Sequence, residues 1–140
     1  DALMAMLQYP QEVGAELVRR ASEAQYVDRT LSVVRDAVGN AIEHLDAPDW
    51  LTAVTNEVPL PFATLVRELG VAPIPERPDY IAVYCRGVVS ALVDRDLQRQ
   101  KRDLLGSLQR LDAAAEPDRY ADLQRDLMRI ETERRDLRAD

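Results

Sequence analysis

The chain has 140 residues, of which 46% are hydrophobic and 31% are charged, and its formal net charge is −7. This length allows one domain with a real core, alone or with an appendage. The acidic balance disfavours strong direct binding to nucleic acid, which depends on a basic surface. No apolar stretch reaches the ~18 residues of a membrane span and no signal peptide is visible, so we expect a cytoplasmic protein without membrane contact.

Proline and capping residues punctuate a series of short predicted helices in the first half of the chain. The predicted helices cover residues 2–8, 10–21, 28–45, 49–58 and 62–70, and a proline-rich loop follows at 71–79. Pro10 suits the first turn of the second helix, Asp28 can cap the third, and Gly70 is placed to stop the fifth. Gly39-Asn40 weakens the middle of the third helix, so a break there fits the pattern.

A long helix is predicted from about residue 79 to 112, because only two glycines interrupt its apolar pattern. Its first half carries a wide apolar stripe, as a helix packed on a bundle needs: Ile81, Tyr84, Cys85, Val88, Val89 and Leu92. Beyond Asp94 the stripe narrows to Leu97, Leu104, Leu108 and Leu111, with Lys101 in one of its positions. Residues 112–118 then form a turn before a closing helix.

The closing helix repeats apolar residues at steps of three and four, which is a heptad pattern. Its seam consists of Tyr120, Leu123, Leu127, Ile130, Arg134 and Leu137. Such a narrow seam is poor at standing alone, so we expect it to pack on the seam at 97–111 in an antiparallel hairpin. Residues 1–93 hold 20 charged side chains and residues 94–140 hold 23, a shift in density that places a boundary near Asp94.

We therefore predict an all-α protein with two parts. Residues 1–93 form a compact helical bundle, and residues 94–140 form a protruding helical hairpin. Two apolar residues of the hairpin fall outside its seams on a helical wheel, with Leu105 about 80° and Met128 about 130° away. One interpretation is that these are ordinary isolated surface residues. The other is a docking surface for a partner protein, formed by Leu105, Ala121, Gln124, Arg125, Met128 and Arg129.

The residues that usually carry catalysis are scarce. A single cysteine, Cys85, excludes an internal disulfide and a multi-cysteine zinc site, and its apolar neighbours predict a buried, inert thiol. The single histidine, His44, sits near a helix end and is expected to be a surface or capping residue. No glycine-rich phosphate loop or calcium loop is present. We expect no catalytic residues, no metal and no cofactor.

Two stretches resemble the C-terminal domain of bacterial replicative DNA primases. The opening ALMAMLQYPQEVGAE is similar to that domain's start, where a short helix ends in a Leu-Gln-x-Pro step. The closing YADLQRDLMRIETERRDLRAD is similar to its final helix, at Leu123, Leu127, Ile130, Glu131, Arg134 and Arg135. Tyr26-Val27 at a helix head, Trp50, the proline-rich loop and the long helix follow in the same order. The resemblance spans essentially the whole chain.

The resemblance implies a helicase-binding domain, in which a helical bundle is followed by a hairpin. The hairpin would dock on the amino-terminal domains of the hexameric replicative helicase, and the bundle would modulate helicase activity. In some members the domain also binds the acidic tail of the single-strand-binding protein. The zinc-binding domain and the polymerase core of a primase would lie upstream, so this fragment is not expected to be an enzyme, whereas its parent would be a DNA-dependent RNA polymerase.

Three functional hypotheses remain. The first is a DNA-replication module of the bacterial primosome, monomeric when free, that docks on the helicase and couples RNA primer synthesis to the fork. The second is a homodimeric coiled-coil or scaffold module whose 97–137 region pairs between chains; light scattering distinguishes it from the first. The third, a small enzyme that uses carboxylates of the bundle, has no histidine or glycine loop to support it.

Overall fold

A computed structural model describes residues 1–139, and every regular element within them is helical. The elements in order are α1 (Ala2–Gln8), α2 (Pro10–Val13), α3 (Ala15–Ser22), α4 (Arg29–Asn40), the short 3₁₀ helix η1 (Ile42–His44), α5 (Trp50–Glu57), the 3₁₀ helix η2 (Leu60–Phe62), α6 (Ala63–Val71), α7 (Ile81–Arg110) and α8 (Pro117–Ala139). The predicted all-α class is therefore confirmed. The described chain divides into two compact units, Asp1–Val93 and a second that begins at Asp94, and α7 contributes residues to both.

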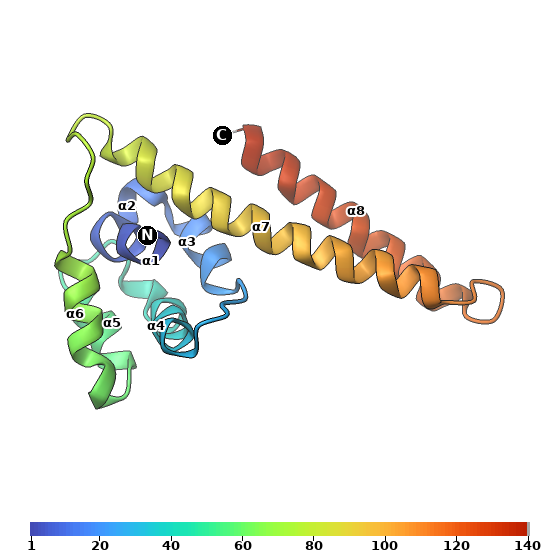
Figure 1. The fold of residues 1–140 in the computed structure, drawn as a ribbon, viewed down its shortest axis with the longest axis horizontal. Helices are drawn as coiled ribbons and strands as arrows, with labels where there is room; N and C mark the ends of the chain where they lie inside the picture. Colours follow the sequence, from blue (N-terminus) through green and yellow to red (C-terminus); the bar gives the residue numbers. More distant parts are fainter. Residues whose placement is uncertain (140) are drawn as a thin grey trace. The chain divides into compact units, whose positions relative to one another are not determined.

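The first unit is built around α1, which is apolar on nearly every side. Leu3, Ala5, Met6 and Leu7 are all buried, and α1 contacts α2, α4, α5 and α6 (Figure 1). A helix that is hydrophobic all round belongs inside a core, and the other helices supply amphipathic faces to cover it. The indole nitrogen of Trp50 donates a hydrogen bond to the Met6 carbonyl oxygen at 3.0 Å, which fixes α5 against α1.

The helix predicted over residues 10–21 is divided in two by Gly14. Its φ of 96° lies in the left-handed region, which L side chains rarely adopt, so α2 ends at Val13 and α3 begins at Ala15. The prediction of one continuous helix was wrong here, because it included Gly14 in the helical pattern although Gly14 adopts a positive φ. The change of direction frees the Val13 carbonyl oxygen, which accepts a hydrogen bond from Arg86 Nη1 at 3.1 Å.

Glycine was also predicted to end or interrupt two other helices, at Gly70 and at Gly39-Asn40. Gly70 does not stop the fifth helix, because α6 continues to Val71 and Gly70 has no positive φ. A Cβ atom at Gly70 would lie 2.5 Å from Cδ1 of Leu51, so a larger residue here would displace the Leu51 side chain where α5 packs on α6. The break in the third predicted helix falls at Ala41, one residue after Gly39-Asn40, and η1 follows it.

The second unit is an antiparallel helical hairpin formed by α7 from Asp94 onward and α8. Two ion pairs join the helices: Asp94 pairs with Arg134 at 2.9 Å, and Lys101 pairs with Glu131 at 2.7 Å. The residue number of the α7 partner rises between the two pairs while that of the α8 partner falls, as antiparallel helices require. The seam predictions agree with this arrangement, since Leu97 and Ile130 are fully buried and the remaining seam residues are half-buried: Leu104, Leu108, Leu111, Tyr120, Leu123, Leu127, Arg134 and Leu137.

Candidate partner-binding surface of the hairpin

Five of the six residues predicted to bind a partner share one face of α8. The members Ala121, Gln124, Arg125, Met128 and Arg129 follow the spacing i, i+3, i+4, i+7 and i+8, and all five are exposed. Arg125 points almost directly away from the seam, at about 170° on a helical wheel, and Met128 lies at about 130°. This set therefore forms the outer face of α8, which we call the α8 outer face.

Leu105, the sixth residue, lies on α7 and is 40% exposed. It is about 80° from its own seam. Because the helices are antiparallel, the sense of this rotation places it on the same side of the hairpin as Gln124 and Met128. The Lys101–Glu131 ion pair lies on that side by the same construction, and its 2.7 Å separation supports the assignment. Leu105 thus borders the α8 outer face.

Met128 is the apolar centre of the α8 outer face. Its side chain is 70% exposed, an unusual state for a large hydrophobic residue within a helix that is otherwise rich in charge. Thioether side chains adapt to irregular partner surfaces and are common at protein-binding sites. Because Met128 is so exposed and the seam is formed by other residues, its side chain does not contribute to packing within the hairpin.

The two arginines of the α8 outer face are each held by a carboxylate on the same helix. Arg125 pairs with Asp122, and Arg129 pairs with Glu133 at 2.8 Å. The Gln124 amide nitrogen donates to the Tyr120 hydroxyl at 3.0 Å. Such exposed pairs contribute only about 0.2–1 kcal/mol each, so a partner can replace them at little cost. The face presents an apolar residue surrounded by donors that are already ordered.

The ion pairs between α7 and α8 shift the pKa values of Glu131 and Arg134. The hydrogen bond from Lys101 lowers the pKa of Glu131 below its ordinary value, with a further contribution from the charges of Lys101 and Arg134. The hydrogen bond with Asp94 raises the pKa of Arg134. Both shifts favour the charged forms of Glu131 and Arg134, so the two ion pairs fix the register of the hairpin together with its seam.

The two residues considered for catalysis, His44 and Cys85, belong to the first unit, whereas the α8 outer face belongs to the second. His44 is exposed in η1, whereas Cys85 is buried in α7. Burial raises the pKa of the Cys85 thiol, and the charge of Glu12 raises it further, so the thiol stays protonated and unreactive. Within residues 1–139 no cluster of histidine, cysteine and carboxylate side chains could hold a metal ion. No helix in that range is long and apolar enough to cross a membrane.

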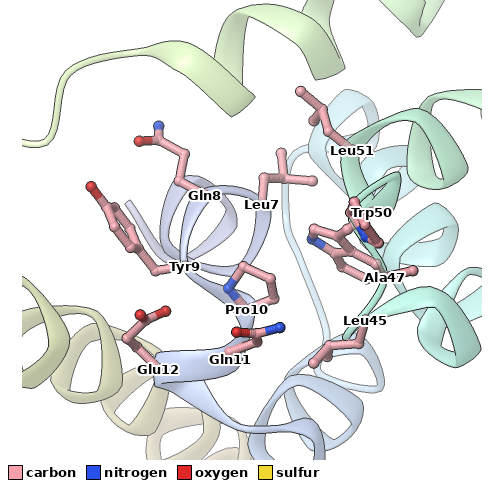
Figure 2. Close-up of a pocket in the computed structure, with 11 residues that line it drawn as sticks. Leu7, Gln8, Tyr9, Pro10, Gln11, Glu12, Leu45, Ala47, Trp50 and Leu51 are labelled. Carbon is pink, nitrogen blue, oxygen red and sulfur yellow. The ribbon is translucent and has the colours of Figure 1, made fainter.

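A groove in the first unit was not found by sequence reasoning. It encloses about 440 Å³ and lies between the segments 7–12 and 45–51 (Figure 2). Trp50 lies behind the groove and belongs to the core, since only 4% of the residue is exposed. Pro10 begins α2 and Pro48 lies in the turn before α5, but neither position indicates a groove in the sequence.

Comparison with known proteins identifies the family. A sequence model of the family described as DNA primase DnaG DnaB-binding matches residues 1–123. The chain belongs to this family. The match ends within α8, so residues 124–140, which include Met128, lie beyond the part of this family that the model covers.

Two similar proteins cover nearly the whole chain. The DNA primase of Mycobacterium leprae (strain TN) is 29% identical over 141 residues, which are 98% of this chain and 22% of that primase. The chain thus spans about a fifth of the length of this curated relative. The solved helicase binding domain of primase from Mycobacterium tuberculosis has a TM-score of 0.75 and 29% identity, over 97% of this chain and 86% of that one. The likeness therefore extends into α8.

Proposed function

We propose that this chain is the non-catalytic helicase-docking module of a bacterial DNA primase. The observation that carries the proposal is the family match over residues 1–123, supported by the likeness to a solved helicase binding domain of primase over 97% of the chain. In the parent protein the module would couple RNA primer synthesis to the replication fork by holding the primase on the replicative helicase.

The part that we propose to dock is the hairpin formed by α7 from Asp94 onward and α8. The α8 outer face, bordered by Leu105, offers Met128 as an apolar anchor among ordered polar side chains. A partner groove or helix commonly binds one face of a helix through anchor side chains that are spaced by about one turn. Because Met128 and Leu105 supply little apolar area, each contact should be of modest affinity.

A hexameric helicase would compensate for this modest affinity. Several equivalent sites on one ring raise the effective concentration of any primase that is tethered nearby, so the assembly can bind more tightly than one contact does. The proposal concerns a monomeric domain. The competing hypothesis is a homodimeric scaffold in which the 97–137 region pairs between two copies. No observation on the described residues favours the single-strand-binding protein as partner over the helicase.

The test is co-elution of this chain with the replicative helicase of the same organism in analytical gel filtration, with light scattering on the eluate. We expect a complex with the helicase hexamer and a monomer when the chain is alone. Asn56→Asp adds a negative charge on the exposed side of α5 and should leave the complex intact. If the helicase elutes without the chain at micromolar concentrations, or if the chain alone is a dimer, the docking proposal is wrong.

A further inference from the structure

The groove in the first unit has the size of a ligand site. Its volume of about 440 Å³ falls within the range of pockets that receive small ligands or a few side chains of a peptide. In Figure 2, Tyr9 and Glu12 stand on one side, Leu45 and Trp50 stand on the other, and Pro10 lies between them. All of these residues belong to the first unit, so the groove is distinct from the α8 outer face.

The walls of the groove are held in place by hydrogen bonds. The indole nitrogen of Trp50 donates to the Met6 carbonyl oxygen, which fixes the orientation of a ring that is almost fully buried behind the groove. The Gln8 amide nitrogen donates to the carbonyl oxygens of Leu69 at 2.9 Å and Ala72 at 2.7 Å. A site whose walls are already ordered loses little conformational entropy when a ligand enters. The groove is therefore preformed.

The wall of the groove carries a negative charge. Glu12 is the one charged side chain among the described residues that line it, and none of these residues is a lysine or arginine. Within residues 1–139, the Glu12 carboxylate and the Tyr9 hydroxyl have no hydrogen-bond or ion-pair partner. The surrounding unit is acidic as well, with 13 acidic and 7 basic residues in 1–93. A cationic group would find complementary charge here, whereas an acidic one would be repelled.

We propose that this groove binds a short extended peptide in which an apolar residue is flanked by arginine or lysine. The apolar side chain lies against the proline rings of Pro10 and Pro48, with the nearly buried Leu45 and Trp50 behind them. The basic side chain pairs with Glu12, and its remaining donors reach the Tyr9 hydroxyl. The charge of the wall decides the class of peptide, because the apolar floor alone would accept any hydrophobic residue.

The experiment uses three capped hexapeptides, acetyl-Gly-X-Leu-Pro-X-Gly-amide, in which X is arginine, glutamine or glutamate. Trp50 is the only tryptophan of the chain and the peptides contain none, so its emission reports on the groove alone. We expect saturable binding of the arginine peptide, weaker binding of the glutamine peptide and none of the glutamate peptide. Backbone amide shifts in a ¹⁵N-labelled chain should change at 7–12 and 45–51, which detects binding even if the emission does not respond.

Two variants make the charge argument specific. Glu12→Gln should weaken the arginine peptide by about 2- to 5-fold, in line with a half-exposed ion pair, and higher salt should weaken it further. Glu57→Gln makes the same change on α5 outside the groove and should leave affinity unchanged. The proposal fails if the arginine peptide produces neither saturable emission change nor shifts, or if both variants have equal effects. Tighter binding of the glutamate peptide would assign the groove to acidic peptides instead.

Discussion

Replacing Ile130 by alanine is expected to open the second unit while the first unit stays folded. Among the described residues from 94 onward, only the apolar side chains of Ile130 and Leu97 are completely shielded from solvent. Loss of a buried isoleucine to alanine costs about 2–5 kcal/mol, because the transfer free energy is lost and a cavity remains. At about 1.4 kcal/mol per factor of ten, this shifts a local opening equilibrium by about 30- to 5,000-fold.

Hydrogen exchange read out by mass spectrometry measures this opening segment by segment. Peptides from α8 should lose protection by that factor in the Ile130→Ala protein, whereas peptides from α1 and α5 should keep theirs. Met128→Ala is the matched control on the same helix, since its side chain is 70% exposed and its removal should change stability by less than about 0.5 kcal/mol. Unchanged exchange in α8, or equal losses in α1 and α8, would refute the description of a hairpin closed by its own seam.

Three further predictions concern the glycines of the first unit and the pH response of the second. Gly14→Ala should destabilise the protein by about 1–2 kcal/mol in urea unfolding, because φ is 96° there. Gly70→Ala should cost about 1–3 kcal/mol through its clash with Leu51, and Leu51→Ala should relieve part of that cost in a double-mutant cycle. Lys101 lowers the pKa of Glu131, so their ion pair stabilises the hairpin above the unfolded-state pKa of Glu131 and loses this effect as pH falls through the folded-state pKa. Hydrogen exchange between pH 7 and pH 3 should therefore show a loss of protection in α8. The Glu131→Gln protein should not show this pH-dependent loss.

The sequence predicts the hairpin well because its information is periodic and local. Steps of three and four from Leu104 to Leu111 and from Leu123 to Ile130 define two narrow seams, and an antiparallel pair joined by a short turn buries both. The ion pairs between the helices were not predicted. Lys101 appeared only as a charged residue within an apolar seam, and its partner Glu131 depends on a register that the sequence pattern does not specify.

The first unit is harder to predict because its details depend on contacts between distant segments. Gly14 and Gly70 look equivalent in a sequence, yet the first turns the chain through a positive φ and the second makes room for Leu51 within a helix. The groove is missed for the same reason, since Glu12 and Trp50 are far apart in the chain. For the α8 outer face, the wheel position of Met128 was available from the sequence, whereas its 70% exposure required the fold.

The most direct measurement of the docking proposal is the affinity of Met128→Asp for the replicative helicase of the same organism, compared with the unaltered chain and with Asn56→Asp. Met128→Asp places a charge at the centre of the α8 outer face without touching the seam, and burying an unpaired carboxylate against a partner is costly. We predict at least about tenfold weaker binding for Met128→Asp, at unchanged circular dichroism, and no change for Asn56→Asp. Equal affinity of all three proteins would contradict docking through this face.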